Sequence, residues 1–192
     1  MSVEENKKGW YKSRGLPHRD DLGLIQSVTF RLADSFPKEL GNHLLSLSPS
    51  ERNDPKTRRL IERVLDEGQG EPWLSHTAAA EIVVDSVRHL DANGSPVYAY
   101  VVMPNHVHLL FQPAETSDLG GLLRNLKGFT ARAINNALNR SGPFWAKDYY
   151  DRFIRTPEHF VDCREYIHMN PVKAKLCSRP EEWLWSSASE PS

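Results

Sequence analysis

Short apolar runs and longer amphipathic segments alternate along the chain, and the two patterns predict different elements. Runs rich in β-branched and aromatic residues are typical of strands and occupy residues 24–32, 97–102 and 106–112, with a further one within 144–154. Apolar residues three or four positions apart predict helices over 56–67, 77–90, 118–139 and 157–169, with a short one after Pro37. The order of elements predicts an α+β fold, an antiparallel-dominated sheet of about four to five strands with helices packed on it.

Turn and breaker residues limit these elements. Gly68 is expected to end the helix before it, and Thr77 could cap the helix that follows. Asn93 precedes a glycine, which is a strong turn signal before the second strand. Pro171 disfavours helical conformation in the residue before it, so the last helix is expected to end at Asn170.

Length and composition fit one domain of an intracellular protein. The chain has 192 residues, 39% of them hydrophobic, which is enough for a sizeable core. We expect an amino-terminal extension over residues 1–20, a domain over 21–178 and a carboxy-terminal tail over 179–192. The amino terminus is polar and long apolar runs are lacking, so we expect no signal peptide and no membrane span. We therefore expect a cytoplasmic protein. Cys163 and Cys177 lack a metal-binding spacing and are expected to be reduced thiols.

Charge is unevenly distributed along the chain. The formal net charge of −1 argues against a simple polyanion binder, but residues 120–180 hold 11 basic and 5 acidic residues, a balance of +6. A cationic half on a nearly neutral protein fits a localised phosphate-binding face. On charge alone, a solvated surface of two helices explains the same balance equally well.

Two histidines separated by one residue lie in the third predicted strand. Side chains at i and i+2 of a strand point to the same face, so His106 and His108 would lie side by side while Val107 points away. Two neighbouring imidazoles on a rigid element supply half of a metal site. For an isolated pair, ordinary strand histidines are the more frequent explanation.

A tyrosine and an asparagine four residues apart lie in the last predicted helix. Tyr166 and Asn170 would share one helical face, about one turn apart. An amide oxygen at the end of that helix could turn toward a cation. Taken singly, Asn170 is explained as a plain cap residue and Tyr166 as a half-buried aromatic.

The combination resembles the REP-associated tyrosine transposases, single-tyrosine members of the HUH endonuclease superfamily. The most specific segments are Met-Pro-Asn-His-Val-His, from Met103, and Tyr-Ile-x-x-Asn-Pro-Val, from Tyr166, about sixty residues apart. The segments that carry the resemblance cover most of the chain: residues 9–18, 23–32, 101–110, 126–130, 144–152, 166–174 and 185–187.

The resemblance implies a ferredoxin-like HUH nuclease fold and a specific chemistry. His106 and His108 match the metal-binding histidines, Tyr166 the nucleophile and Asn170 a polar third ligand. The family binds Mg²⁺ or Mn²⁺ and cleaves single-stranded DNA at or beside palindromic hairpins. The tyrosine forms a 5′-phosphotyrosine and leaves a 3′-hydroxyl that can reverse the reaction on a new strand. Some relatives are homodimers that exchange helices, whereas a single copy could place Tyr166 in cis, and both arrangements remain open.

The residue types agree with this chemistry. A phenol has a pKa near 10, so its attack on a phosphate at neutral pH requires activation, and a divalent ion can supply it as a Lewis acid. Histidine ligands suit Mn²⁺ and oxygen ligands suit Mg²⁺, so the sequence does not choose between the metals. Basic residues near the two motifs could follow the DNA backbone: Lys127, Arg152, Lys173 and Lys175.

Two other functions and two other nucleophiles are alternatives to this interpretation. A non-catalytic protein of the same fold could hold DNA hairpins without cutting them, and a metal hydrolase could use water and leave Tyr166 without a role. Tyr149 and Tyr150 are rival nucleophiles, but they lie in a predicted strand without a polar ligand four residues later, so sheet-face aromatics explain them better. His168 is expected to point away from Tyr166, toward the surface or a partner.

Overall fold

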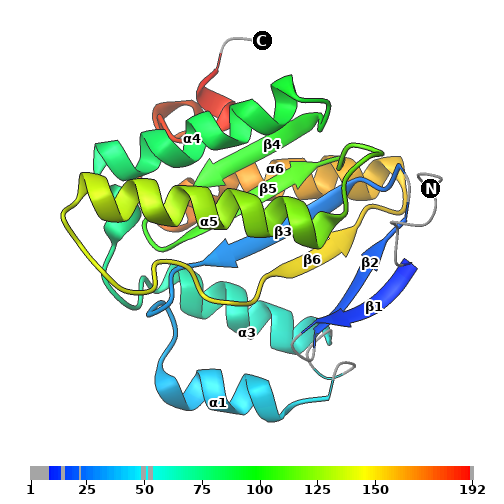
Figure 1. The fold of residues 1–192 in the computed structure, drawn as a ribbon, viewed down its shortest axis with the longest axis horizontal. Coiled ribbons are helices and arrows are strands. Elements are labelled where there is room, and N and C mark those ends of the chain that lie inside the picture. The colour runs from blue at the N-terminus through cyan, green and yellow to red at the C-terminus, as the bar shows by residue number, and fades with distance from the viewer. Residues whose placement is uncertain (1–8, 14–15, 22, 49–50, 52–53, 191–192) are drawn as a thin grey trace.

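The main body of the protein is a four-stranded antiparallel sheet with helices on both faces (Figure 1). The computed structural model describes residues 9–13, 16–21, 23–48, 51 and 54–190. The strand order is β4 (Val97–Val102), β5 (His106–Phe111), β3 (Gln26–Arg31) and β6 (Tyr150–Phe153). The two central strands, β3 and β5, therefore pair on both edges, and the α+β sheet expected from the sequence is confirmed.

Helices α4 (Thr77–Ala92) and α5 (Leu119–Ala137) cover the front face of the sheet in Figure 1. The alternating residues of β3 and β5 that point to this side, Val28 and Leu109 among them, pack against Val83 of α4 and Leu123 of α5 in the largest apolar cluster. Strict alternation leaves the other side of the same strands free for polar side chains. The chemistry-bearing residues of β5 therefore lie on the back face.

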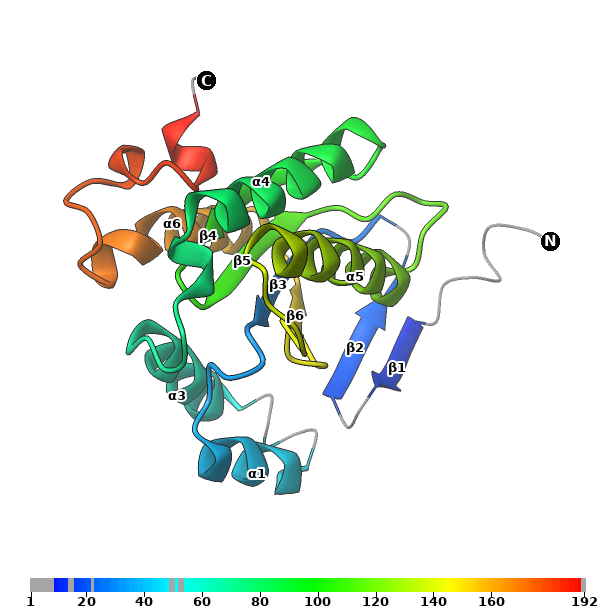
Figure 2. The same ribbon diagram turned by 60° about the vertical axis from the view of Figure 1, so that its left-hand side comes forward.

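Helix α6 (Pro157–Lys173) packs on the back face, where Ile167 contacts a smaller apolar cluster built on β4 and β5. Two further helices, α1 (Lys38–Ser46) and α3 (Pro55–Asp66), pack on each other through a separate apolar cluster. Both helices lie below the sheet in Figure 2. Asp54 caps α3 by accepting a hydrogen bond from the backbone N–H of Lys56. No helix within the described ranges has the length and apolarity to cross a bilayer.

Two details of the helix limits differ from the sequence-based expectation. His76, rather than Thr77, is the N-cap residue of α4, and it makes no side-chain cap hydrogen bond. Helix α6 does not end at Asn170 but continues through Pro171 to Lys173. The burial of Asn170 and Pro171 offsets the local cost of proline there, and the last turn is closed by the N–H of Ala174, which donates to the Asn170 carbonyl.

The two ends of the described chain pack in different ways. The amino-terminal residues form a separate antiparallel hairpin of β1 (Gly9–Ser13) and β2 (Leu16–Asp20). The tail contains the short 3-10 helices η3 (Pro180–Glu182) and η4 (Ser187–Ser189), and a third one, η2 (Trp73–Ser75), precedes α4. Between η3 and η4 the tail runs beside the edge strand β4, where the N–H of Val102 donates to the Trp185 carbonyl over 2.8 Å. The tail thereby protects an otherwise open sheet edge.

The core on the front face gives a first prediction. Leu109 is completely buried on β5, so Leu109→Ala should lower the free energy of unfolding by about 2–5 kcal/mol through lost apolar contact and a residual cavity. Leu184→Ala is the matched control, since this leucine is 72% exposed and should change the value by less than about 0.5 kcal/mol. Urea denaturation measures both. Equal effects would show that the sheet does not pack as described.

Candidate active site

The two histidines of β5 lie side by side on the back face, as the strand pattern predicts. His106 and His108 are 1% and 4% exposed, and their Nε2 atoms lie 3.0 Å apart. On the other ring nitrogen, Nδ1, His108 lies 2.7 Å from the Thr29 hydroxyl of the neighbouring strand, and His106 lies 2.7 Å from the Asn105 side-chain oxygen. Each ring is thus held by a second contact with Nε2 turned into the same space.

Helix α6 brings the other two predicted residues to this point. The Nδ2 atom of Asn170 lies 3.3 Å from Nε2 of His108, and its Oδ1 atom is buried without a hydrogen-bond partner among the described residues. The rings of Tyr166 and His108 meet edge to face with centroids 5.4 Å apart. The Tyr166 hydroxyl is likewise buried and has no partner in the described part of the chain. All four residues therefore converge, and both halves of the site come from one chain.

The geometry of these donors fits a divalent cation. Two nitrogen ligands at right angles, each about 2.1 Å from an ion, are about 3 Å apart, which matches the separation of the two Nε2 atoms. Burial holds the pKa of His106 well below its ordinary value and lowers that of His108 to about 3, so both imidazoles are neutral and able to ligate. Rotation of the Asn170 amide by half a turn would bring its orphaned oxygen to the same point. In the described ranges no three His, Cys, Asp or Glu side chains gather as a metal site, so the set is two imidazoles and an amide.

Helix α3 covers the site from below and contributes acidic residues that no sequence pattern predicts there. A cavity of about 320 Å³ extends between α3, α6 and the strands β3 and β6, and its lining includes Glu62, His108 and Tyr166. An outer cleft is lined by Glu62, Asp66, Tyr166 and Lys173. Burial raises the pKa of the Tyr166 hydroxyl, and the carboxylates of Glu62 and Asp66 raise it further.

The four basic residues expected to follow DNA lie in different environments. Lys127 turns inward and donates a hydrogen bond to the Asp148 carbonyl over 2.9 Å. Arg152 lines the cavity, and the Lys173 ammonium lies 4.7 Å from the centre of the Tyr166 ring. Lys175 lines the outer cleft. Three of the four thus lie around Tyr166, whereas Lys127 serves the packing of α5.

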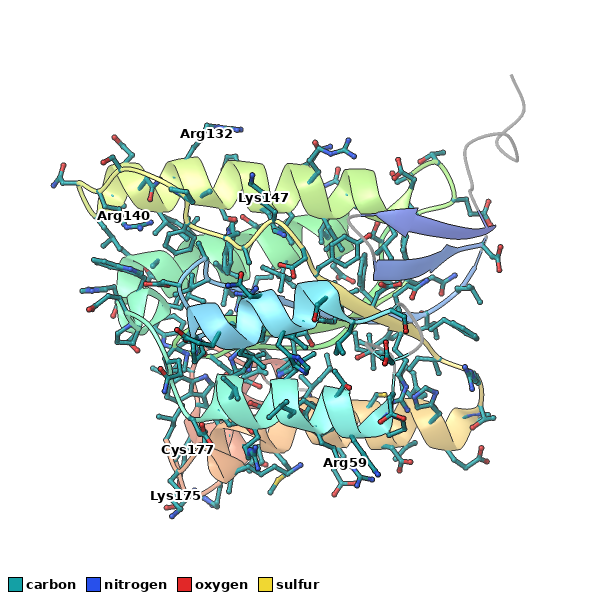
Figure 3. The ribbon with its side chains drawn as sticks, turned by 90° about the horizontal axis from the view of Figure 1, so that it is seen from below. Arg59, Arg132, Arg140, Lys147, Lys175 and Cys177 are labelled. Atoms are coloured by element: carbon teal, nitrogen blue, oxygen red, sulfur yellow. The ribbon has the colours of Figure 1, made fainter. Side chains whose placement is uncertain are left out.

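The basic residues labelled in Figure 3 come from different sides of the molecule. Figure 3 shows Lys175 near the end of α6 and Arg59 on α3 along one border. Arg132 lies along the opposite border on α5, and Arg140 and Lys147 follow that helix. The site described above opens on the first of these borders.

The rival residues are placed less favourably. Tyr149 and Tyr150 line the same cavity, but they come from the segment that begins β6 rather than from α6, the helix that carries Asn170. His168 does point away from Tyr166, as expected, but it is half-buried, and its Nε2 lies 3.0 Å from the Ser187 hydroxyl of the tail.

The acidic helix gives a pH-dependent prediction. More than a third of Asp66 is exposed, yet partial burial of its carboxyl raises its pKa to about 6; Glu62 adds to the rise and Lys173 opposes it. The ionised carboxylate therefore costs stability above about pH 6, and this cost vanishes below about pH 4, where Asp66 is protonated in the folded and unfolded states.

Asp66→Asn should accordingly raise the free energy of unfolding at pH 7.5 by about 1 kcal/mol, allowing for solvent screening, and should have no effect at pH 4. Glu67→Gln, a change at the exposed neighbouring carboxylate, is the control and should alter neither value by more than about 0.5 kcal/mol. Urea denaturation at the two pH values measures the free energy of unfolding of both variants and the wild type. A loss of stability at pH 7.5 would show that Asp66 is held by an attractive partner instead.

Comparison with known proteins agrees with this arrangement. A sequence model of the family described as IS200-like transposases matches residues 80–170, a span that includes both histidines, Tyr166 and Asn170. A Haemophilus influenzae protein named for a REP-associated tyrosine transposase is 26% identical over 99 residues, which cover 46% of this chain and 56% of that protein. The matched stretch thus spans little more than half of the relative.

A solved structure shares the fold. It is described as a REP-associated tyrosine transposase bound to a REP hairpin, and it superposes with a TM-score of 0.54 at 15% identity, over 87% of this chain and 78% of that one. The family model, the named relative and the fold agree with one another: the chain is similar to the IS200-like transposases over residues 80–170 and to a REP-associated tyrosine transposase over about half of its length, and it shares the fold of the solved structure.

Proposed function

We propose that this protein is a metal-dependent, site-specific endonuclease and strand transferase of single-stranded DNA that acts at palindromic hairpins through a 5′-phosphotyrosine. One observation carries the proposal: a buried tyrosine hydroxyl without a partner among the described residues lies on α6 beside two neutral imidazoles and an orphaned amide oxygen. A buried polar group without a partner costs stability, which indicates a functional rather than a structural reason for it.

Each residue has a defined task in this chemistry. His106, His108 and Asn170 would hold Mg²⁺ or Mn²⁺, which when bound acts as a Lewis acid on the scissile phosphate. The Tyr166 oxygen attacks the phosphorus, a P–O bond to tyrosine forms, and the bond to the 3′-oxygen breaks. The phosphate ester is conserved, so the released 3′-hydroxyl can attack the phosphotyrosine and rejoin a strand without another energy source. The Lys173 ammonium over the Tyr166 ring favours negative charge on that oxygen.

The proposed DNA substrate rests on the relatives. The solved structure that shares this fold is described as bound to a REP hairpin, and the basic residues Arg152, Lys173 and Lys175 surround the approach to Tyr166 here. One chain contributes both halves of the site, which supports cleavage with Tyr166 in cis; a homodimer stays an alternative arrangement of the same proposal.

A second function is favoured by one observation. Glu62 and Asp66 line the outer cleft beside Tyr166, and two carboxylates there would repel a phosphate. This repulsion would not matter in a protein that binds hairpins without cutting them, because no phosphate has to reach Tyr166.

Incubation with single-stranded oligonucleotides that carry palindromic hairpins of the host genome separates the two functions. With Mn²⁺, the enzyme should give a protein–DNA adduct that survives a denaturing gel, and with EDTA it should give none. Hairpin binding without an adduct across such substrates, with or without Mn²⁺, would support the non-catalytic protein. Products with a free 5′-phosphate and no adduct would indicate a hydrolase that uses water.

A further inference from the structure

Asn105, directly before the first histidine, makes more contacts at the site than its place in a turn suggests. It is 2% exposed. Its Nδ2 atom donates hydrogen bonds to the carbonyl oxygens of Leu65, over 3.1 Å, and Gln69, over 3.2 Å. Its Oδ1 atom lies 2.7 Å from Nδ1 of His106. The asparagine therefore joins the histidine pair to the carboxyl end of α3 and the turn that follows.

These contacts fix the orientation of the amide. Carbonyl oxygens only accept hydrogen bonds, so the group that faces Leu65 and Gln69 must be the NH₂ group of Asn105. The opposite atom is then an oxygen, which only accepts, and the hydrogen bond of 2.7 Å to His106 requires a proton on Nδ1 of that ring. A neutral imidazole with its proton on Nδ1 has a free lone pair on Nε2.

His108 is less restricted, because the Asn170 amide 3.3 Å from its Nε2 atom can turn either its NH₂ group or its oxygen toward the ring. The group opposite its Nδ1 atom is the Thr29 hydroxyl, at 2.7 Å, and a hydroxyl can either donate or accept. His108 can therefore donate from Nε2 to His106 across the 3.0 Å between them, or carry its proton on Nδ1 and offer Nε2 to a cation. Only the second form makes both Nε2 atoms available together.

We propose that Asn105 is a positioning residue that holds His106 with its proton on Nδ1, so that Nε2 is preset to bind a divalent cation, and ties this ligand to the end of α3. The metal-binding part rests on the proposed function, whereas the form of the imidazole does not. Outer hydrogen-bond partners of this kind set the ring orientation and basicity of metal-binding histidines.

Nuclear magnetic resonance of protein labelled with ¹⁵N in histidine tests the form of the ring without metal or DNA. Long-range proton–nitrogen spectra at fixed neutral pH distinguish the two neutral forms, and the signals missing in His106→Gln assign the ring. In the wild type, His106 should carry its proton on Nδ1 both without metal and with Mg²⁺, while His108 should change to that form only with Mg²⁺. A His106 ring with its proton on Nε2 in the metal-free wild type would overturn the proposal.

Variants separate positioning from a general structural role. Asn105→Ala should release His106 into a mixture of both forms and weaken Mn²⁺ binding, measured by electron paramagnetic resonance, by about 10- to 100-fold. Asn105→Asp keeps an acceptor for Nδ1 and should keep the ring form, although it loses the donor to Leu65 and Gln69. Thr29→Val, which removes the contact of the other histidine, should leave the form of His106 unchanged.

Ser186→Ala is the control for the loss of a buried hydrogen bond, because the hydroxyl of this fully buried serine bonds to the tail and the edge strand, away from the histidine pair. It should keep the wild-type affinity for Mn²⁺. If Asn105→Ala retained both the wild-type ring form and affinity, the positioning role would be refuted. If the wild type bound no Mn²⁺ while His106 kept its proton on Nδ1, the proposed metal chemistry would fail and the positioning of the ring would stand.

Discussion

Tyr166→Phe should abolish the covalent protein–DNA adduct and lower strand cleavage by about four orders of magnitude or more, while the protein stays as stable as the wild type. The loss follows because the proposed nucleophile is removed and no other group takes its place in the same geometry. The retained stability follows because the hydroxyl is buried and has no partner in the described part of the chain. Its removal should leave the free energy of unfolding unchanged or raise it by about 1 kcal/mol.

Tyr150→Phe is the matched control. Tyr150 lines the same cavity but comes from β6, and its variant should form the adduct with less than about a threefold change in rate. Cleavage is followed on denaturing gels with a hairpin oligonucleotide and Mn²⁺, and stability by urea denaturation. If the Tyr166 variant formed the adduct and the Tyr150 variant did not, Tyr150 would be the nucleophile instead of Tyr166.

His108→Ala should produce the second largest effect, a loss of Mn²⁺ affinity by about 100-fold or more. A direct ligand contributes more than an outer partner, whose removal alone costs about 10- to 100-fold. In the wild type, Mn²⁺ at about 100 times its dissociation constant should stabilise the folded state by about 2.7 kcal/mol and raise the melting temperature by about 5–10 °C. The variant should show almost no such rise.

His168→Ala is the control for the loss of an imidazole near Tyr166. This half-buried histidine contacts the tail at Ser187 and not the pair on β5, so its variant should keep the full rise in melting temperature. Thermal unfolding with Mn²⁺ and with EDTA provides the comparison. An equal rise in wild type and His108→Ala would place the metal elsewhere.

The sequence could predict those parts of the site that local periodicity determines. Alternation along one strand places His106 and His108 on one face, and helical spacing places Tyr166 and Asn170 one turn apart, both as the structure has them. The strands and helices follow the apolar pattern closely for the same reason. The predicted end of α6 at Asn170 was wrong, because the burial of Asn170 and Pro171 outweighs the local cost of proline.

Other features depend on contacts between distant segments, which no local pattern carries. Glu62 and Asp66 look like the solvated side of an amphipathic helix, and only the docking of α3 brings them beside Tyr166. Lys127 looks like a surface cation, but its partner, the Asp148 carbonyl, lies beyond the end of its helix. The role of Asn105 could not be predicted either: the sequence places its amide next to His106, but the carbonyl groups that orient this amide lie at the end of α3 and in the turn after it.

Mass spectrometry of the protein–DNA adduct would identify the residue that attacks the DNA. Protein incubated with a hairpin oligonucleotide and Mn²⁺ would be digested with nuclease and protease, and the peptides searched for a nucleotide linked through its 5′-phosphate. We expect this modification on the peptide that carries Tyr166, and on that residue within it. A modification on Tyr149 or Tyr150, or cleaved DNA with no modified peptide, would contradict it.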